Sequence, residues 1–239
     1  MTELATYTLD DGIATIALDD GKANALSIAM LTRLHELFDA AERDGAIVLL
    51  TGREGRFSAG FDLKVFQAGD GEAVLEMLRL GATLAERILS FPTPVVIGCT
   101  GHAIAAGSFL ALAADVRIGA DGAFQLGMNE VKIGLTVPWW AIALARQRLT
   151  TADFDRAVVL GHGYDPAAAV AAGFLDRIVA PEQVRAEALA AASELKQLNM
   201  AAHHATKLRA RQPALRAIRA AVEQELASFD GLGMTTAPA

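Results

Sequence analysis

Two short runs of this sequence, 47–50 and 95–99, are apolar at every position. A strand with one face in water alternates apolar and polar side chains, whereas an unbroken apolar run is expected of a strand that is covered on both faces. Helix signals lie between these runs and after them. Because helices on both sides of a mostly parallel sheet provide such cover, we predict an α/β fold.

Segments around the two buried runs carry signals for further strands and helices. Residues 7–9 and 13–18 are rich in β-prone side chains and flank the turn residues Asp10-Asp11-Gly12, which predicts a hairpin. Ser27 can cap a helix whose apolar side chains recur at helical spacing. Other predicted elements are short strands at 116–118 and 124–126, a helix that begins at Pro138, a short helix from Asp165 to Gly173, and a long helix that begins at Pro181.

Strand and helix signals alternate to about residue 180, and the remainder is helical with many Ala and Arg residues. We therefore predict an α/β core at residues 1–180 and a C-terminal helical region at residues 181–239. No internal repeat, low-complexity tract or Gly/Ser linker marks independent domains. The Ala-rich C-terminal helices have apolar faces with few neighbours predicted within one chain to cover them, which favours oligomerisation through this region.

Charge and cysteine content exclude several classes of function. A net charge of −7 argues against non-specific nucleic-acid binding, which needs a large basic surface. The start lacks the pattern of a signal peptide, and no stretch approaches the ~18 apolar residues that span a bilayer, so we expect a cytoplasmic protein with no membrane partner. The lone Cys99 permits no intrachain disulfide. Six basic residues between Lys196 and Arg219 form either a solvated helix face or a phosphate site, and both interpretations stay open.

Two segments contain residues that favour exposed backbone amides. Residues 51–64 follow a buried strand and include glycines that allow sharp turns. Residues 101–110 pass from strand into helix through residues nearly without side chains, and unpaired amides at a helix N-terminus suit developing negative charge. The alternatives are a generic loop for the first segment and tight helix-on-sheet packing for the second.

A third segment, residues 129–140, places the carboxylate of Glu130 in otherwise apolar sequence. Partial desolvation raises the pKa of a carboxyl group, which makes it a usable base near neutral pH. A surface Glu at the start of a helix is the alternative interpretation. The residues themselves thus offer one candidate base and two candidate groups of backbone donors.

In this order and spacing, the three segments resemble the crotonase superfamily, also called the enoyl-CoA hydratase/isomerase family. The resemblance extends over most of the chain and includes the segments 20–26, 115–118 and 172–176. It implies a crotonase-type spiral of ββα units with an acyl-CoA site in the core and a C-terminal helical region that packs between subunits. Members of the family are usually trimers or dimers of trimers, so we expect a homotrimer or a hexamer.

The resemblance also implies roles for individual residues. The backbone amides of Phe61 and Ala106 would form an oxyanion hole, and Glu130 would be the catalytic base. The substrate would be an acyl-CoA thioester, so coenzyme A is part of the substrate and we expect no cofactor and no metal. Trp139, Trp140 and residues 66–89 are expected to shape the acyl tunnel. Residues expected to bind substrate are Lys22, Ala23, Ala59, Gly60, Asp62, Leu63, Lys64, Phe109 and Trp139.

Phe109 is the point at which this sequence departs from the hydratase pattern, which has a second catalytic Glu there. Hydration uses two cooperating carboxylates, whereas a single base can move a proton between two carbons. The sequence therefore most resembles the Δ3,Δ2-enoyl-CoA isomerases of fatty-acid or related acyl-CoA metabolism. Hydration, hydrolysis, decarboxylation, dehalogenation and acyl-CoA binding without turnover stay open, and the acyl group is not indicated. Ala105 stands where peptidases of this fold carry their serine nucleophile, which argues against peptidase activity.

Overall fold

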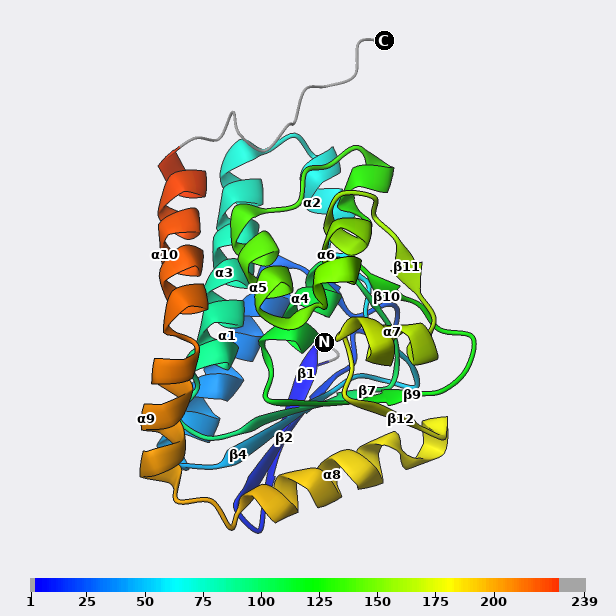
Figure 1. The fold of residues 1–239 in the computed structure, drawn as a ribbon. Helices are drawn as coiled ribbons and strands as arrows, with labels where there is room; N and C mark the ends of the chain where they lie inside the picture. Colours follow the sequence, from blue (N-terminus) through cyan, green and yellow to red (C-terminus); the bar gives the residue numbers. More distant parts are fainter. Residues whose placement is uncertain (1–2, 228–239) are drawn as a thin grey trace.

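The computed structural model describes residues 3–227. A six-stranded sheet crosses the lower part of the molecule in Figure 1. The two apolar runs form its central strands, which pair in parallel. The predicted hairpin is confirmed as an antiparallel pair at one edge. In spatial order, the sheet contains β1 (Ala5–Asp10), β2 (Ile13–Leu18), β4 (Ile47–Thr51), β7 (Val95–Cys99), β9 (Val116–Ala120) and β12 (Arg177–Val179).

Helices cover both faces of this sheet, as the apolar runs predict. Leu49 of β4 and Val96 of β7 pack with alanines of α8 (Val184–Leu195), which lies beneath the sheet in Figure 1. Leu50 and Ile97 belong to the main core on the other face. Burial of side chains of this size contributes roughly 1.5–3 kcal/mol each. The two-sided burial confirms the predicted α/β architecture.

From the first sheet the chain passes repeatedly into a second, smaller one. β4 leads to β5, β7 to β8 and β9 to β10, and a helical segment follows in each case. This arrangement confirms the spiral of ββα units. The second sheet has the order β11-β10-β8-β5, and its strands are β5 (Gly55–Ser58), β8 (Gly101–Ile104), β10 (Leu126–Gly127) and β11 (Gly163–Tyr164), with β3 (Ala25–Leu26) and β6 (Gly60–Phe61) as a separate parallel pair.

Most predicted helix starts are confirmed. Ser27 caps α1, where its Oγ accepts a hydrogen bond from Met30 N at 3.2 Å. The strand predicted at 124–126 begins later, at Leu126, and Pro181 begins a 3₁₀ turn rather than a long helix. The sequence signals did not predict the long helix at Gly71–Ser90, α3. The helices are α1 (Ile28–Arg43), α2 (Leu63–Gln67), α3 (Gly71–Ser90), α4 (Ala106–Ala113), α5 (Trp139–Arg148), α6 (Thr151–Val158), α7 (Pro166–Ala172), α8, α9 (Met200–Ala210) and α10 (Gln212–Ala227), with the 3₁₀ turns η1 (Glu130–Ile133) and η2 (Pro181–Gln183).

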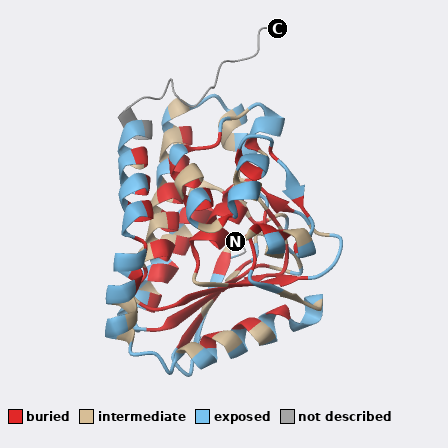
Figure 2. Ribbon diagram, in the orientation of Figure 1, coloured by how far each residue is buried: buried red, intermediate tan, exposed pale blue. Residues whose placement is uncertain are grey.

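The C-terminal helices pack on their own chain, which corrects one expectation. α10 lies along α3 and α5 (Figure 1), and Figure 2 shows buried residues on its inner side. Leu215 and Ile218 belong to the main core. The expectation that few neighbours within one chain cover the C-terminal helices is therefore wrong for residues 181–227. Residues 228–239 of the predicted C-terminal region lie outside the described residues. Within residues 3–227, no helix combines the length and apolarity needed to cross a membrane.

A buried ion cluster joins α9 to the sheet. The carboxylate of Asp115 lies 2.6 Å from Lys207 Nζ and 2.8 Å from Arg211 Nη2. The same carboxylate accepts a hydrogen bond from Val95 N at 2.7 Å, at the start of β7. Burial lowers the pKa of Lys207 to about 8, against the opposing effect of Asp115. Because charges in this position cannot be hydrated, each depends on its partners.

We expect Asp115→Ala to lower the free energy of unfolding by about 3–5 kcal/mol, because Lys207 and Arg211 would keep buried charges without a counterion. Urea-induced unfolding at neutral pH measures the loss. Glu86→Ala is a matched control, since Glu86 pairs with Arg219, whose side chain is 59% exposed, and such a pair contributes about 0–1 kcal/mol. Equal losses in the two variants would contradict the proposed importance of the cluster.

Candidate active site

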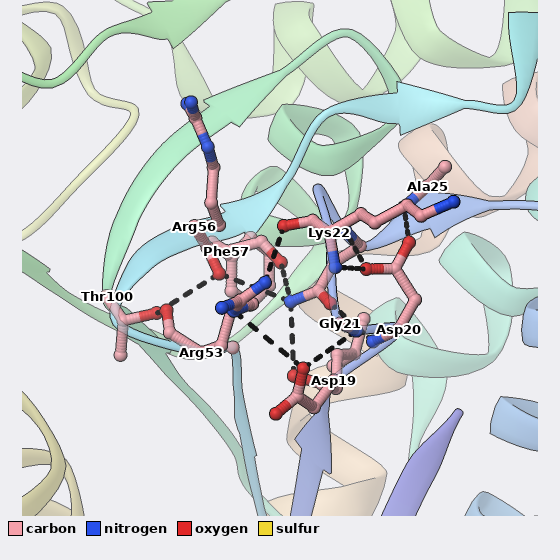
Figure 3. A network of polar contacts seen from close by, with 12 residues as sticks. Asp19, Asp20, Gly21, Lys22, Ala25, Arg53, Arg56, Phe57 and Thr100 are labelled. Atoms are coloured by element: carbon pink, nitrogen blue, oxygen red, sulfur yellow. Dashed lines mark hydrogen bonds and ion pairs between the residues drawn. The ribbon is translucent and has the colours of Figure 1, made fainter. Parts of the chain in front are cut away.

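A buried asparagine joins the turn at residues 19–24 to β5. Figure 3 shows Asp19, Asp20 and Lys22 of this turn beside Arg56 and Phe57 of β5. Asn24 has a φ of +53° and a side chain with no exposed surface. Its Nδ2 donates to Leu18 O at 3.1 Å, to Arg56 O at 3.2 Å and to Phe57 O at 3.1 Å. Its Oδ1 accepts from Asp20 N at 3.0 Å. One side chain thus holds β2 and β5 around the start of β3.

The loop after β5 is held by the same turn. Ser58 Oγ donates to Asn24 O at 2.7 Å and accepts from Gly60 N at 3.1 Å. Ala59 N donates to Ala23 O at 3.0 Å. These three hydrogen bonds hold residues 58–60 against residues 23 and 24, so β6 begins in a defined position beside β3.

The amide of Phe61 points away from β3. Phe61 is paired in register with Leu26, whose carbonyl accepts from Asp62 N at 3.4 Å. In a parallel pair of strands, Leu26 therefore bonds to the residues on either side of Phe61, and not to Phe61 itself. The N–H of Phe61 is consequently directed to the other side of its strand.

A strained turn at Ala105 starts α4 directly against β6. Ala105 has φ +50° and ψ −125°, a conformation that residues with a Cβ rarely adopt. A Cβ built on Gly60 would lie 2.8 Å from the Cβ of Ala105 and 3.1 Å from the nitrogen of Ala106. The Ala106 amide belongs to the first turn of α4, where no carbonyl of the same helix can accept from it. The segments that carry the Phe61 and Ala106 amides are therefore in contact.

Beside these segments lies a cavity whose described lining contains one ionisable side chain, Glu130. Glu130 begins η1 and is 5% exposed. Its Oε2 has no hydrogen-bond partner among the described residues. Burial raises the pKa of Glu130 to about 7, against the opposing effect of its own backbone N–H. The cavity is lined by Ala59, Phe61, Leu63, Phe66, Leu78, Ala105, Asn129, Glu130, Ile133, Leu135, Thr136 and Pro138.

The cavity brings several predicted site residues together. Phe61 and Glu130 line it along with Ala59 and Leu63, and Ala106 follows the lining residue Ala105. Sequence reasoning singled out the segment 129–140 but did not assign to the site four residues of this segment that line the cavity, Ile133, Leu135, Thr136 and Pro138. No group of His, Cys, Asp and Glu side chains able to hold a metal ion occurs within residues 3–227.

Two bulky residues predicted to bind substrate lie outside the cavity wall. Phe109 is completely buried, and its ring packs edge-on against Trp140 at a centroid distance of 5.3 Å. Trp139 is 55% exposed and lines an open groove between α5 and α10. The side chain at position 109 is therefore part of the apolar core, and the groove beside Trp139 is separate from the cavity of Glu130.

The remaining predicted residues do not line the cavity: Gly60 lies in β6, Lys64 lies in α2, and the others lie in the segments beside β3 and α2. Lys22 and Lys64 are exposed. Asp62 caps α2 by accepting from Lys64 N at 3.0 Å. Ala23 and Gly60 contribute the backbone contacts described above, and substrate binding by these five residues stays a prediction.

Comparison with known proteins gives one family match and one curated relative of particular interest. The family model described as Enoyl-CoA hydratase/isomerase matches residues 8–236. The chain is similar to the human mitochondrial enoyl-CoA delta isomerase 1, with 30% identity over 194 residues. The match covers 77% of this chain and 62% of the human protein, so this chain spans less than two thirds of that relative.

Solved structures with the same fold include both hydratases and isomerases. An enoyl-CoA hydratase from Mycobacterium ulcerans is 46% identical, with a TM-score of 0.92 and coverage of 95% of this chain and 100% of that one. A Mycobacterium tuberculosis protein is described in one structure as an enoyl-CoA isomerase and in another as a probable enoyl-CoA hydratase. It is 44% identical, and the first of these structures has a TM-score of 0.91 and coverage of 95% of this chain and 99% of that one. The similarity thus extends over nearly the whole chain.

We expect Glu130 to make stability depend on pH. Because its pKa is raised in the folded state, the protonated carboxyl favours folding, and this contribution is complete below the unfolded pKa and lost as pH rises through about 7. Glu130→Gln removes the titrating group. Between about pH 4 and about pH 8, the unfolding free energy of the wild type should fall relative to that of the variant by on the order of 3 kcal/mol. A difference that stays constant across urea unfolding curves in this range would show that Glu130 is not desolvated.

Proposed function

We propose that this chain, which belongs to the enoyl-CoA hydratase/isomerase family, converts a 3-enoyl-CoA thioester into the 2-enoyl isomer. The observation that carries the proposal is the single ionisable side chain, Glu130, in the described wall of an otherwise uncharged cavity. One group that removes a proton and then returns it is sufficient for this reaction. The proposed enzyme acts in the cytoplasm. It uses no cofactor, since coenzyme A is part of its substrate.

In the proposed reaction, the carboxylate of Glu130 takes a proton from C2 of the thioester. The electrons of that C–H bond form a C1=C2 bond while the carbonyl electrons move to oxygen, which gives a dienolate. The amides of Phe61 and Ala106 would stabilise this oxygen, and donors of this kind contribute about 3–4 kcal/mol each. Protonated Glu130 then returns the proton to C4, the carbonyl re-forms, and the double bond lies between C2 and C3.

The surroundings of Glu130 support this role. A pKa of about 7 makes both the proton-accepting and the proton-donating form accessible at neutral pH. Its unpaired Oε2 leaves an acceptor site free for the substrate proton. Phe66, Leu78 and Leu135 give the cavity an apolar wall, which suits an acyl chain and limits entry of water.

Hydration is the second candidate, because the similar Mycobacterium ulcerans protein is described as an enoyl-CoA hydratase. Hydration would need a group that activates water in addition to one that protonates the α-carbon. Phe109 lies in the core where the hydratase pattern has its second Glu. This position therefore favours isomerisation over water addition.

We expect Glu130→Gln to lower kcat for isomerisation of a 3-enoyl-CoA by at least about 10²-fold, because the variant keeps the size of the side chain but lacks the base. Binding of the thioester should change far less, since the backbone amides and the apolar wall remain. Stopped-flow absorbance separates kcat from substrate affinity. Glu54→Gln is the control, because Glu54 is an exposed carboxylate outside the cavity.

Two results would count against the proposed isomerase. Undiminished isomerisation by Glu130→Gln would reject the single-base mechanism. Efficient hydration of a 2-enoyl-CoA by the wild-type protein would favour the second candidate. Thioester binding is measured on the same preparations, so a misfolded Glu130→Gln sample would be detected by loss of binding.

We also propose that the protein is a homotrimer or a dimer of trimers. Large apolar side chains that are exposed in the single chain, such as Val159 at 60% and Leu160 at 66%, would be covered in such an assembly. Sedimentation equilibrium at micromolar concentration should therefore give three or six times the chain mass of 25.1 kDa. A monomer would refute this proposal.

A further inference from the structure

The side chain of Ser58 lies between the two segments that carry the proposed oxyanion donors. Ser58 is the last residue of β5 and has no exposed surface. A Cβ built on Gly107 would lie 2.6 Å from Ser58 O and 2.9 Å from Ser58 Cβ. Ser58 therefore contacts the residue that follows Ala106, and it lies just before the strand that contains Phe61.

A β-bulge accounts for the burial of this serine. β5 pairs in parallel with β8, and the register shifts between Arg56 and Ser58. The partners of these two residues, His102 and Ala103, are consecutive, so Phe57 is the extra residue. Side chains alternate between the faces of a sheet, and a bulge redirects those that follow it. Ser58 consequently lies on the face opposite Arg56, which is why Arg56 is exposed and Ser58 is buried.

The hydroxyl of Ser58 connects two backbone groups. Its Oγ donates to Asn24 O at 2.7 Å and accepts from Gly60 N at 3.1 Å. Because a hydroxyl is both a donor and an acceptor, one oxygen atom can link a carbonyl to an N–H in this way. The side chain of Asn24 is itself bonded to three backbone carbonyls. The hydroxyl thus fixes Gly60, the residue before Phe61, to a rigid point of the fold.

The start of α4 is held without this hydroxyl. Ala105 N donates to Gly127 O at 2.8 Å, and Ser108 Oγ donates to Ala105 O at 2.8 Å. Loss of the Ser58 hydroxyl would therefore loosen β6 at Gly60 while α4 stayed in place. Since β6 would keep its short pairing with β3, the expected effect is a displacement of β6 and not unfolding.

We propose that Ser58 is a positioning residue whose hydroxyl fixes the Phe61 amide relative to the Ala106 amide. This role rests on the proposed function, in which the two amides stabilise the oxygen of the dienolate. Donors of this kind act only when they are aimed at the place where charge develops, and a displacement of ~1 Å can lower a rate about 10²-fold. Ser58 is not among the described residues that line the cavity, so it acts on the amides and not on the substrate.

Kinetics provide the first test. We expect Ser58→Ala to lower kcat for isomerisation by about tenfold or more, but by less than the ~10²–10³-fold that follows loss of a whole donor. KM should change by less than about threefold, because Glu130 and the apolar wall remain. Ser58→Cys retains a weak donor and a weak acceptor, so its kcat should lie between those of wild type and Ser58→Ala. It also provides the same comparison should Ser58→Ala not fold.

Thr93→Val is the matched control. Like Ser58, Thr93 is buried, and its Oγ1 donates to a backbone carbonyl, that of Ala46, at 2.6 Å. Thr93 precedes β7, at the opposite end of this strand from β8. Valine keeps the shape of threonine but removes the hydroxyl. This variant should lose stability to urea without a change in kcat.

Infrared spectroscopy tests the two donors directly. Hexanoyl-CoA with ¹³C at the thioester carbonyl is a suitable probe, since it has no double bond to move. Hydrogen bonds from the two amides lower the stretching frequency of the bound carbonyl, which isotope-edited difference spectra report. We expect the full lowering in wild type and Thr93→Val, a smaller one in Ser58→Ala, and an intermediate one in Ser58→Cys.

Three results would overturn the role of Ser58. The first is an unchanged kcat and an unchanged carbonyl frequency in Ser58→Ala. The second is an equal loss of kcat in Ser58→Ala and Thr93→Val, which would trace the effect to stability in general. The third is a lowered kcat in Ser58→Ala with the carbonyl frequency of the wild type, which would show that the donors had not moved.

The infrared measurement does not depend on turnover. A wild-type protein that does not isomerise a 3-enoyl-CoA, but whose effect on the bound carbonyl is reduced in Ser58→Ala, would refute the proposed function and support the role of Ser58. An isomerase whose kcat and carbonyl frequency do not respond to Ser58→Ala would refute the role of Ser58 alone. A wild-type protein that leaves the frequency of the bound carbonyl unchanged would refute both.

Discussion

The arrangement of the site depends on backbone-to-backbone packing between two segments, 52–60 and 101–107. A Cβ on Gly101 would lie 2.1 Å from the carbonyl carbon of Gly55, and a Cβ on Gly107 would lie 2.6 Å from Ser58 O. Side chains are thus excluded between the segments, and neither segment can shift without the other. The Phe61 amide belongs to a strand that follows directly on the first segment, and the Ala106 amide belongs to the second. Their relative position is therefore set by the core of the fold and not by surface loops.

Much of this architecture could be predicted because it depends on local or strongly periodic signals. The unbroken apolar runs at 47–50 and 95–99 required cover on two faces, and the helices provide it. Glu130 could be predicted because burial of a carboxylate is energetically unfavourable, so a carboxylate within an apolar segment indicates a functional role. Ser27 has both the side chain and the position of a helix cap, and it forms the expected bond.

Other features could not be predicted because they arise from contacts between distant segments. Gly81 weakens the helical signal of α3, since glycine costs about 1 kcal/mol relative to Ala within a helix. A Cβ there would lie 2.5 Å from the ring of Phe61, so the glycine makes room for that ring. Trp139 and Trp140 are adjacent apolar residues, and only packing determines that the second is buried and the first exposed. The hydrogen bond from Ser58 to Asn24 likewise joins segments that lie far apart in the sequence.

Glu130 lies on the same short segment as part of the wall of its cavity. η1 contains both Glu130 and Ile133, and Leu135 follows almost directly. Phe66 and Leu78, in contrast, reach the cavity from α2 and α3. Redesign of chain-length selectivity through Ile133 or Leu135 would also displace the carboxylate, so gains in selectivity on that side would be accompanied by losses in rate. Substitutions at Phe66 and Leu78 separate the two properties, which makes these helices the better place to alter the range of substrates.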